Sequence, residues 1–441
     1  MKYIYGLNRS GKSIISYLKK INENFCCWDD NSEIRSNIIN FDESIELVEP
    51  KNINFKLIKE SFISPGISFS NKKLIILKNN NIKLYRDLEI YSRVAKNKKI
   101  IAITGTNGKS TTAKLISDML KNSDLDNFLG GNIGVPLLDF VNDKEDKKYH
   151  VIELSSFQLE SYHSFQPYIS ILLNISEDHL DRYKDFQSYA SQKEKIIDSN
   201  SGKFNIICVD NSFTLKIYKK NINKVIPISK NFLKKGVFFK DGYIIDNYFK
   251  PKHCTLLESI SPSLFGNFNI ENILAAYVVS KIMNIKQDNF VNISKNYKGL
   301  PHRLETIFKS KYLQIINNSK ATNLDAAVKS ISNYENIYLI LGGRAKEKDF
   351  TKILKFKDRL NRIFLIGESA TKIENQLSNK IQCNNCNTLV EAIKKIYLET
   401  NRDFKYKTIL FSPACSSFDQ FLNYEERGKY FKKLIKSYYN E

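Results

Sequence analysis

A strand, a glycine-rich turn and a helix start follow one another between residues 101 and 112, and they constrain the fold more than any other feature. The apolar run Ile101-Ala102-Ile103 predicts a buried strand, and Lys109-Ser110-Thr111 opens an amphipathic stretch typical of a helix. Between them lies the turn Gly105-Thr106-Asn107-Gly108. Backbone N–H groups of such a turn can surround phosphate oxygens, while the lysine neutralises charge and a hydroxyl reaches Mg²⁺. The segment therefore predicts a phosphate-binding loop and a protein that uses ATP.

The size and composition of the chain are those of a soluble multidomain protein. With 441 residues, 42% hydrophobic and 26% charged, the chain is long enough for roughly two to four domains with packed cores. No apolar run reaches the length of a membrane span, so we expect no membrane insertion. The strand-like Lys2–Tyr5 stands at the N-terminus with no signal peptide before it. Both observations predict a cytoplasmic protein.

The formal net charge of +21 has two readings. It could indicate nucleic-acid binding, or it could reflect a composition rich in Lys, Asn and Ile that distributes lysines over every surface. The lysines form no single tract and no nucleic-acid motif accompanies them, so we expect no nucleic-acid partner. A positive field would still attract anionic small substrates.

The cysteines favour a reducing compartment and no metal site. There are seven, an odd number, which is typical of reduced thiols. Cys383 and Cys386 form one C-x-x-C pair in an Asn-rich stretch that we expect to be a loop. A zinc site would need two more ligands, and no second pair of this spacing exists. The sequence therefore predicts no structural metal at this pair.

The pattern of apolar runs predicts three consecutive α/β units. Residues 1–95 form a small Rossmann-like unit, with strands at Lys2–Tyr5 and Phe25–Trp28, a turn at Gly6–Gly11 and a helix over Ser13–Lys20. Residues 96–298 form a central ATPase-like parallel sheet after a linker or helix end at Lys96–Lys99, and residues 299–441 form a Rossmann-like C-terminal unit. The further strands are expected at His150–Leu154, Ile169–Leu173, Asn205–Val209, Leu313–Ile316, Ile337–Leu341, Arg362–Ile366 and Thr408–Phe411.

Polar motifs recur after these strands, where ligands bind in parallel sheets. They are Thr104-Gly105-Thr106-Asn107-Gly108-Lys109-Ser110-Thr111, Gly130-Gly131-Asn132-Ile133-Gly134, Glu153-Leu154-Ser155-Ser156-Phe157-Gln158, Asn174-Ile175-Ser176-Glu177-Asp178-His179-Leu180-Asp181-Arg182, Gly266-Asn267-Phe268-Asn269-Ile270-Glu271-Asn272 and Pro301-His302-Arg303. Together they resemble the Mur ligase family, the ATP-dependent amide ligases of peptidoglycan precursor synthesis. The resemblance spans nearly the whole chain.

Two C-terminal motifs narrow the resemblance within the family. Asn318-Ser319-Lys320-Ala321-Thr322-Asn323 and Ser412-Pro413-Ala414-Cys415-Ser416-Ser417-Phe418-Asp419-Gln420-Phe421 resemble the members that add D-glutamate. The resemblance implies an ADP-forming ligase that joins UDP-N-acetylmuramoyl-L-alanine to D-glutamate through an acyl phosphate. It implies ATP and Mg²⁺ as cofactors, and we expect a monomer.

The catalytic and metal-binding candidates rest partly on position and partly on the resemblance. Ser110 and Glu153 lie at the ends of neighbouring predicted strands, so hard oxygen ligands for one Mg²⁺ come together there. The resemblance adds His179 as a ligand of a second ion. It also places Lys193 where the family carries a carbamoylated lysine, whose anionic oxygens suit magnesium. Lys109 completes the catalytic set.

The resemblance also assigns the binding residues. For ATP these are Gly105, Thr106, Asn107, Gly108, Lys109, Ser110, Thr111, Asn269 and Asn272 near adenine, Arg303 near the phosphates and ribose, and Asn318. For the UDP-sugar they are Asn8, Arg9, Ser10, Gly11, Asp29–Asn31 and Ser64-Pro65-Gly66, with Asn132, Ser155 and Gln158 facing the sugar and L-alanyl end. For D-glutamate they are Lys320, Thr322, Lys346, Ser417, Phe418 and Tyr424. Asn269 has a second reading as a helix cap before the helical run Ile273–Met283.

Four residues at three sites depart from the family pattern. Asn318 stands where many members have Asp, Asn8 replaces a glycine of the first loop, and Asp30-Asn31 replaces a Thr-Arg pair of some relatives. Other readings of the chain are another Mur-type ligase, a folylpolyglutamate-type ligase, or a basic nucleotide- or nucleic-acid-binding protein without catalysis. The C-terminal motifs favour the D-glutamate reading over the other ligases.

Overall fold

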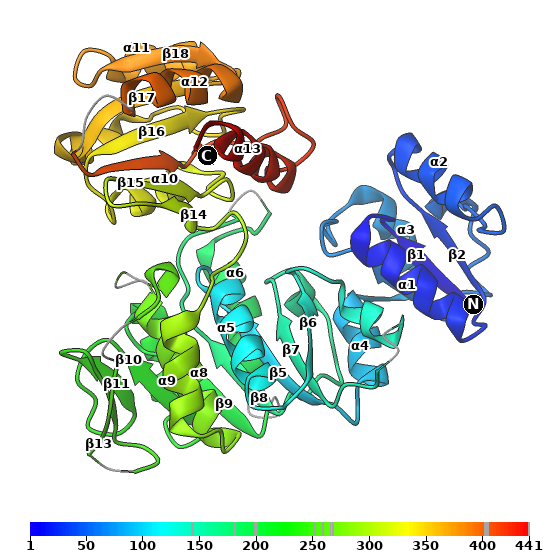
Figure 1. Ribbon diagram of the computed structural model, residues 1–441. Helices are drawn as coiled ribbons and strands as arrows, with labels where there is room; N and C mark the ends of the chain where they lie inside the picture. Colours follow the sequence, from blue (N-terminus) through cyan, green and yellow to red (C-terminus); the bar gives the residue numbers. More distant parts are fainter. Residues whose placement is uncertain are drawn as a thin grey trace. The chain divides into compact units, whose positions relative to one another are not determined.

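A computed structural model describes residues 1–142, 145–179, 182–197, 202–250, 252–257, 260–264, 266, 269–400 and 405–439. Of the quoted motifs, Leu180, Asp181, Asn267 and Phe268 lie outside the described residues. Within these ranges the strands form three separate sheets (Figure 1). The chain divides into two compact units, Met1–Ile260 with Asn267–Asn296, and Ser261–Gly266 with Tyr297–Glu441. The predicted α/β class is confirmed. In the part that the structure describes, no helix is both long and apolar enough to cross a membrane.

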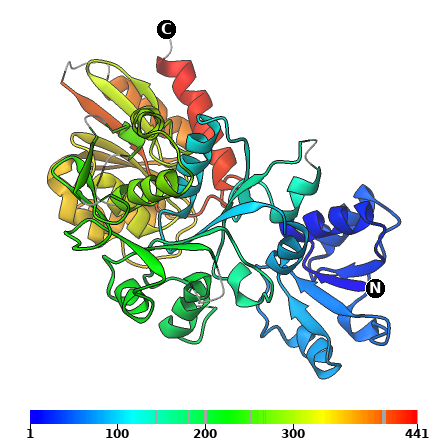
Figure 2. The same ribbon diagram turned by 90° about the horizontal axis from the view of Figure 1, so that it is seen from below.

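The first sheet is parallel throughout, in the order β2-β1-β3-β4. Figure 2 shows this blue part of the chain from a second direction, with the N-terminus beside its strands. Its elements are β1 (Lys2–Tyr5), α1 (Arg9–Lys20), β2 (Phe25–Trp28), α2 (Ser32–Phe41), β3 (Glu60–Ile63), α3 (Ile75–Asn79), β4 (Lys83–Tyr85) and α4 (Asp87–Val94).

The second sheet has the order β13-β12-β11-β10-β9-β8-β5-β7-β6. From β6 to β11 neighbouring strands are parallel, and β12 and β13 extend the sheet in antiparallel pairs. Its elements are β5 (Lys99–Thr104), α5 (Lys109–Lys121), β6 (Asn127–Gly131), β7 (Tyr149–Glu153), β8 (Ile169–Leu172), α6 (Phe186–Glu194), β9 (Phe204–Cys208), α7 (Ser212–Lys220), β10 (Val225–Ser229), β11 (Val237–Lys240), β12 (Tyr243–Asp246), β13 (His253–Leu256), α8 (Ile270–Ile282) and α9 (Gln287–Asn296).

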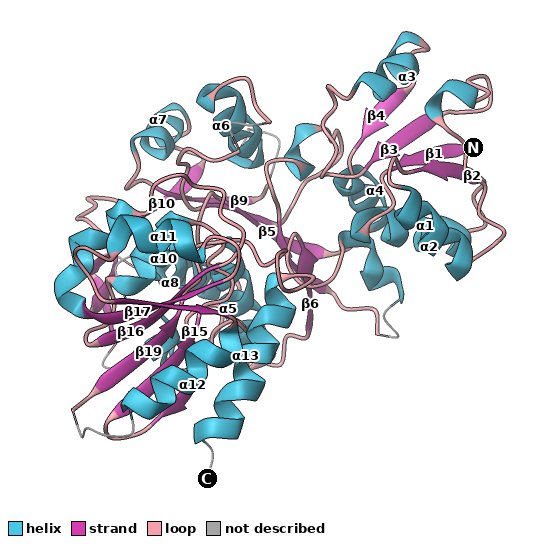
Figure 3. Ribbon diagram, turned by 90° about the horizontal axis from the view of Figure 1, so that it is seen from above, coloured by secondary structure: helices cyan, strands magenta, loops and turns pink. Residues whose placement is uncertain are grey.

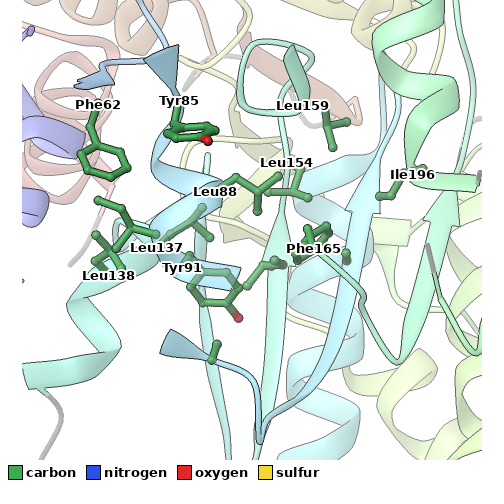
Figure 4. Close-up of a cluster of buried hydrophobic side chains, with 14 of the residues drawn as sticks. Phe62, Tyr85, Leu88, Tyr91, Leu137, Leu138, Leu154, Leu159, Phe165 and Ile196 are labelled. Atoms are coloured by element: carbon green, nitrogen blue, oxygen red, sulfur yellow. The ribbon is translucent and has the colours of Figure 1, made fainter. Parts of the chain in front are cut away.

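One hydrophobic cluster joins the first two sheets into a single unit. Figure 4 shows side chains from β3, β4 and α4 packed with those that follow β6 and β7. Its labelled members are Phe62, Tyr85, Leu88, Tyr91, Leu137, Leu138, Leu154, Leu159, Phe165 and Ile196. Because this core is continuous, the loops at the ends of β3 and β7 are held by shared packing.

The second unit is built on the sheet β14-β15-β19-β16-β17-β18, parallel except for β14. Helices α10 and α11 cover one face and α12 and α13 the other, as Figure 3 shows and as two separate buried clusters confirm. The elements are β14 (Glu305–Lys309), β15 (Leu313–Asn317), α10 (Leu324–Ile331), β16 (Ile337–Gly342), β17 (Leu360–Ile366), α11 (Ala370–Leu377), β18 (Cys383–Asn387), α12 (Leu389–Thr400), β19 (Lys407–Phe411) and α13 (Tyr424–Tyr439).

Three predicted boundaries were wrong. Helix α1 begins at Arg9, not Ser13, because the segment read as a turn already belongs to the helix. Gly11 allows this, since a Cβ there would lie 2.0 Å from the carbonyl oxygen of Gly6. Helix α8 spans Ile270–Ile282 rather than Ile273–Met283, and Lys99 belongs to β5 rather than to a linker.

The predicted loop at Cys383 and Cys386 was also wrong, because both residues lie in strand β18. The strand is polar and rich in Asn, so its own sequence does not favour a strand. Backbone pairing with β17 at the sheet edge forms it instead. Cys383 packs against the cluster under α10 and α11, and Cys386 belongs to the cluster under α12 and α13, so the two thiols lie in different clusters.

Candidate active site

The predicted strand, glycine-rich turn and helix are all present between β5 and α5. Gly105 and Gly108 have φ of 156° and 84°, a region that favours glycine. A Cβ at Gly108 would also lie 2.3 Å from Oδ1 of Asn272. Nζ of Lys109 donates to the carbonyl oxygens of Gly105 and Thr106, both at 2.8 Å. The lysine amine therefore lies against the loop backbone, where a phosphate-binding lysine is needed.

Two residues that the sequence analysis quoted without a role support this loop. The side-chain oxygen of Asn174 accepts from the backbone N–H of Asn107 at 2.8 Å, and its carbonyl oxygen accepts from that of Thr106 at 2.8 Å. Nδ2 of Asn174 in turn donates to Oε1 of Glu271 at 2.8 Å. Glu271 is buried, and burial raises the pKa of its carboxyl. Their place in motifs after β8 and at the start of α8 was the only signal in the sequence.

The predicted adenine-contacting residues Asn269 and Asn272 lie next to the same loop. Oδ1 of Asn272 accepts from the hydroxyl of Thr112 at 3.0 Å, and its Nδ2 donates to Oδ1 of Asn269 at 2.7 Å. Both asparagines are buried. Asn269 occupies the N-cap position of α8, but its side chain makes no capping hydrogen bond. The pair therefore links α8 to α5 beside Gly108.

Ser110 and Glu153 meet at the edge of the sheet, as their strand positions predicted. The Ser110 hydroxyl donates to Oε2 of Glu153 at 2.6 Å, and Nδ2 of Asn132 donates to Oε1 at 2.7 Å. Glu153 is 2% exposed. A Cβ at Gly131 would lie 2.2 Å from the carbonyl oxygen of Glu153, so this glycine lets β6 approach β7 closely. A buried carboxylate and a hydroxyl here are hard oxygen donors of the kind that magnesium prefers.

Lys193 projects from α6 toward the same loop. Its Nζ donates to the carbonyl oxygen of Gly105 at 2.8 Å, the oxygen that also accepts from Lys109. Burial, and then the charge of Lys109, lower the pKa of Lys193 well below its ordinary value. An amine in this environment favours its neutral, nucleophilic form.

His179 follows β8 with a positive φ of 53°. Its ring lies 4.8 Å from that of Phe157, and its Nε2 is 3.5 Å from Oδ2 of Asp178. Within the described ranges, no group of three or more His, Cys, Asp or Glu side chains is arranged to hold a metal ion. The metal-binding roles of Ser110, Glu153, His179 and Lys193 therefore remain predictions.

The predicted sugar-facing residues connect to the first sheet through Asp87. Oε1 of Gln158 accepts from the backbone N–H and the hydroxyl of Ser155, both at 3.1 Å. Nε2 of Gln158 donates to Oδ2 of Asp87 at 3.2 Å, and Ser10, in α1, is half-buried. Burial raises the pKa of Asp87. Arg9 reaches across to the carbonyl oxygen of Gly134.

The acidic residues after β2 organise the first turn. Oδ2 of Asp29 accepts from the backbone N–H of Leu7 at 2.7 Å, and its Oδ1 accepts from that of Asn31 at 2.9 Å. Oδ2 of Asp30 accepts from the hydroxyl of Tyr5 at 2.7 Å. The predicted uridine-binding turn is therefore held in place by Asp29, which is itself buried.

In the second unit, Arg427 connects the two motifs that resemble the D-glutamate-adding members. It is 1% exposed, and its Nε and Nη2 donate to the hydroxyl and carbonyl oxygens of Ser319 at 3.1 and 2.9 Å. Its Nη1 donates to the carbonyl oxygen of Cys415 at 3.1 Å. Burial lowers the pKa of Arg427 to about 10. The sequence around this arginine, within the charged helix α13, carries no signal for such a role.

The predicted D-glutamate residues differ in exposure. Ser417 is 2% exposed, whereas Phe418 is 63% exposed. Lys346 is exposed and follows Gly342-Gly343, where a Cβ at Gly343 would lie 2.5 Å from the carbonyl oxygen of Ser416. Thr322 is half-buried, and Nζ of Lys320 lies 5.9 Å from the ring centre of Tyr424, the first residue of α13.

Asn318 and Arg303, the remaining nucleotide candidates, also lie in the second unit. Asn318 is buried, and its Oδ1 accepts from the backbone N–H of Leu304 at 3.2 Å. Its Nδ2 donates to the hydroxyl of Ser412 at 3.1 Å. The backbone N–H of Arg303 donates to the carbonyl oxygen of Leu300 at 3.2 Å, and its side chain is half-buried. Asn318, directly after β15, therefore links the residue before β14 to the residue after β19 through its amide group.

Comparisons with known proteins agree with this arrangement. Residues 103–280 match the Mur ligase middle domain. The chain is 34% identical over 438 residues to the UDP-N-acetylmuramoylalanine–D-glutamate ligase of Rickettsia bellii, covering 98% of this chain and 96% of that protein. The crystal structure of UDP-N-acetylmuramate–alanine ligase from Thermotoga maritima matches with a TM-score of 0.60 and 16% identity over 99% of both chains. The MurF ligase of the same organism, solved in complex with ADP, matches with a TM-score of 0.58 and 17% identity over 87% of this chain and 97% of that one.

Proposed function

This chain belongs to the Mur ligase family, and we propose that it joins the L-alanyl carboxylate of UDP-N-acetylmuramoyl-L-alanine to the amine of D-glutamate. It is an ATP-dependent, ADP-forming amide ligase of peptidoglycan precursor synthesis. The observation that carries the substrate assignment is the nearly full-length similarity to relatives named for this reaction. The arrangement of Lys109, Ser110 and Glu153 supports the use of ATP.

The reaction needs activation because a carboxylate oxygen is a poor leaving group. Transfer of the γ-phosphoryl group of ATP to the L-alanyl carboxylate gives an acyl phosphate and ADP. The D-glutamate amine then attacks the carbonyl carbon, and the tetrahedral intermediate releases inorganic phosphate and a proton as the amide forms. Every stage holds several negative charges together, so positive charge at the site lowers the barrier. Lys109 supplies one such charge from the phosphate loop.

The residues present fit a magnesium ion beside that loop. Glu153 and Ser110 would hold the ion through oxygen atoms, and the ion would neutralise charge on the transferring phosphoryl group. Asn132 keeps the Glu153 carboxylate oriented through its 2.7 Å hydrogen bond. His179 is the proposed ligand of a second ion.

Lys193 is the proposed site of carbamoylation. Its neutral amine would attack CO₂, lose one proton to solvent and become an anionic carbamate. Burial, and then the charge of Lys109, lower the pKa of Lys193, and a carbamate would place an anion beside Lys109 where the ammonium form places a second cation. The carbamate oxygens would then serve as magnesium ligands, because magnesium prefers oxygen ligands to the nitrogen of an unmodified lysine.

The two substrates have separate proposed sites. In the first unit, Arg9, Ser10, Asn132, Ser155 and Gln158 would bind the UDP-sugar and its L-alanyl end. In the second unit, a dicarboxylate such as D-glutamate needs cations and hydroxyl donors. The candidates there are Lys320, Thr322, Lys346, Ser417, Phe418 and Tyr424, and Arg303 and Asn318 would contact ATP.

We also propose the remaining features of organisation. The three sheets support domains over residues 1–95, 96–298 and 299–441 that bind the UDP-substrate, ATP and the amino acid respectively. The protein would act as a monomer in the cytoplasm. The seven cysteines, all free thiols, are consistent with a reducing compartment.

Phosphate release tests the proposal directly. Purified protein would receive ATP, Mg²⁺ and UDP-N-acetylmuramoyl-L-alanine, with D-Glu, L-Glu, L-Ala or diaminopimelate as the amino acid. We expect release that depends on both the UDP-substrate and D-Glu. Release with a different amino acid would keep the ligase and overturn the assignment of the second unit. Release that is independent of both co-substrates, or salt-sensitive nucleic-acid binding without any release, would overturn the proposal.

A further inference from the structure

Two buried arginines converge on one carboxylate in the first unit. Arg86 is fully buried, and the side chain of Arg182 is 9% exposed. Nε of Arg86 donates to Oε2 of Glu160 at 3.1 Å and its Nη2 pairs with the same atom. Nη2 of Arg182 lies 3.2 and 3.1 Å from the two carboxylate oxygens, and the hydroxyl of Tyr183 donates to Oε1 at 3.0 Å. Glu160 thus sets the position of both guanidinium groups.

The same two arginines hold the loop that follows β3. Nη1 of Arg86 donates to the carbonyl oxygens of Ser64 at 2.7 Å and Ile63 at 3.2 Å. Nη2 of Arg182 donates to the carbonyl oxygen of Ile67 at 3.2 Å. The loop Ser64-Pro65-Gly66-Ile67 is therefore fastened at both ends. Its residues Ser64-Pro65-Gly66 are among those that the family resemblance assigns to the UDP-sugar.

Aromatic rings fix the planes of the two guanidinium groups. The Arg86 guanidinium lies 3.7 Å from the ring centre of Phe69, and that of Arg182 lies 3.9 Å from the ring centre of Phe157. Each arginine is therefore held by a carboxylate, a ring and a loop carbonyl. Such a group has little freedom to adopt another position.

The charges of the cluster do not cancel. Two guanidinium groups face the single carboxylate of Glu160, and the neighbouring Asp87 has a pKa raised by burial, which disfavours its charged form. The two guanidinium groups thus place positive charge next to the loop. In a poorly solvated site such a charge attracts the diphosphate of a nucleotide more strongly than a surface lysine does.

The cluster also reaches the segment that carries His179. The backbone N–H of Arg182 donates to the carbonyl oxygen of His179 at 3.0 Å, and that of Tyr183 at 3.2 Å. Movement of Glu160 would thus shift both the loop after β3 and the segment after β8. These are the proposed nucleotide and metal-binding segments of the first unit.

We propose that Glu160 is a positioning residue for the UDP-bearing substrate, acting through Arg86 and Arg182 on the loop 64–67. The inference rests on the proposed function, because it takes this loop as the nucleotide-binding one. Glu160 itself touches no reacting group. Its carboxylate orients two arginines, and they set the loop backbone that receives the uridine diphosphate.

The test compares Glu160→Gln with Glu60→Gln in the full-length protein. Glu60 is a matched control, since its buried carboxylate also faces two cations, Lys2 and Arg93. It is the first residue of β3, whereas the loop 64–67 follows the last residue of that strand. Glu160→Gln should raise the KM and the directly measured Kd for UDP-N-acetylmuramoyl-L-alanine by roughly ten- to a hundredfold. The KM values for ATP and D-Glu should stay within about twofold of wild type, and Glu60→Gln should leave all three KM values near wild type.

A second variant separates the charge from folding effects. Glu160→Asp keeps the negative charge on a shorter side chain, so it should recover most of the affinity for the UDP-substrate that Glu160→Gln loses. If Glu160→Gln does not fold, Glu160→Asp and Arg86→Lys still test the inference by the same KM and Kd measurements. Arg86→Lys should weaken UDP-substrate binding, because all donors of a lysine lie on one nitrogen and cannot reproduce the planar fork that contacts Glu160 with Nε and Nη2 and the loop carbonyls with Nη1.

The outcomes distinguish this inference from the proposed function. Wild-type protein that neither binds the UDP-substrate nor releases phosphate with it would overturn the proposed function. Active wild type, with an unchanged UDP-substrate Kd in Glu160→Gln, would overturn the positioning role. The same would follow if Glu60→Gln weakened binding equally, because the effect would then reflect general destabilisation.

Discussion

At the scale of single residues, the pair Lys109 and Lys193 is the most informative part of the site. Both amines donate to the carbonyl oxygen of Gly105 at 2.8 Å. Lys109 does so from the first residue of α5, and Lys193 does so from α6 with only 2% of its surface exposed. Two ammonium groups this close repel each other where water cannot screen them. Lys193, which burial also penalises, is therefore the one expected to lose its proton and react.

We predict that Lys193→Ala lowers phosphate release by roughly a hundredfold or more, and that added acetate partly restores it. The carboxylate of acetate would supply the anionic oxygens of the lost carbamate. Steady-state phosphate release with and without acetate checks this. If propylamine restores activity and acetate does not, Lys193 acts as an amine. Lys195→Ala is the control, since Lys195 donates to the carbonyl oxygen of Glu160 at 3.0 Å and acetate should not rescue it.

At the scale of elements, the site forms where strands end and helices begin. The carboxyl ends of β5, β7 and β8 lie side by side because these strands are parallel neighbours. Lys109 lies in the segment after β5 and Asn174 in the segment after β8, whereas Glu153 is the last residue of β7. Close approach of these segments requires glycine at the crowded positions, of which Gly108 is the clearest.

We predict that Gly108→Ala raises the KM for ATP by at least about tenfold. An added Cβ would lie 2.3 Å from Oδ1 of Asn272 and would displace either the loop or α8. Gly242→Ala is the matched control, because Gly242 has φ of 83°, close to the 84° of Gly108, with nothing within 4 Å of the added Cβ. The control should lose only about 1 kcal/mol of stability from backbone strain and keep its KM for ATP. Equal KM values in both variants would contradict the clash.

At the scale of the whole molecule, the contacts of His150 show how the first and second sheets are joined in one unit. It lies in β7, is 1% exposed, and its Nδ1 is 2.8 Å from the hydroxyl of Tyr91 in α4. Its ring centre lies 4.7 Å from that of Phe140 and 5.2 Å from that of Phe128. Burial lowers the pKa of His150 from 6.5 to about 4. The core that links the first two sheets therefore contains a neutral histidine.

This burial predicts a pH dependence of stability. Between pH 6.5 and about 4, His150 is protonated in the unfolded chain but neutral in the folded one, so stability falls as the pH falls through this range. The full loss is about 3 kcal/mol, and above pH 6.5 the term is constant. Hydrogen exchange of β7 peptides from pH 4 to 7 measures it. The pH dependence should be weaker in His150→Gln and unchanged in His163→Gln, whose histidine is exposed.

Much of the fold follows from the sequence because its signals are local. Strands buried on both faces leave continuous apolar runs, and polar or glycine residues mark their ends, so β5, β8, β16 and β19 lie close to their predicted ranges. Strand β18 was mistaken for a loop because edge pairing, not its Asn-rich sequence, makes it a strand. The antiparallel β12 and β13 were not predicted, since short strands carry a weak signal of their own.

The α/β class, the phosphate-loop segment, the family and the candidate side chains can all be predicted from the sequence, because each depends on a run of consecutive residues. Which of these side chains meet depends on the packing of distant segments. This packing brought Ser110 to Glu153, set Lys193 beside Lys109, and gathered Arg86, Glu160 and Arg182 around one loop. Arg427, which holds Ser319 and Cys415 together, had no signal in its own helix. Such contacts depend on how distant segments pack, and local periodicity carries no information about that.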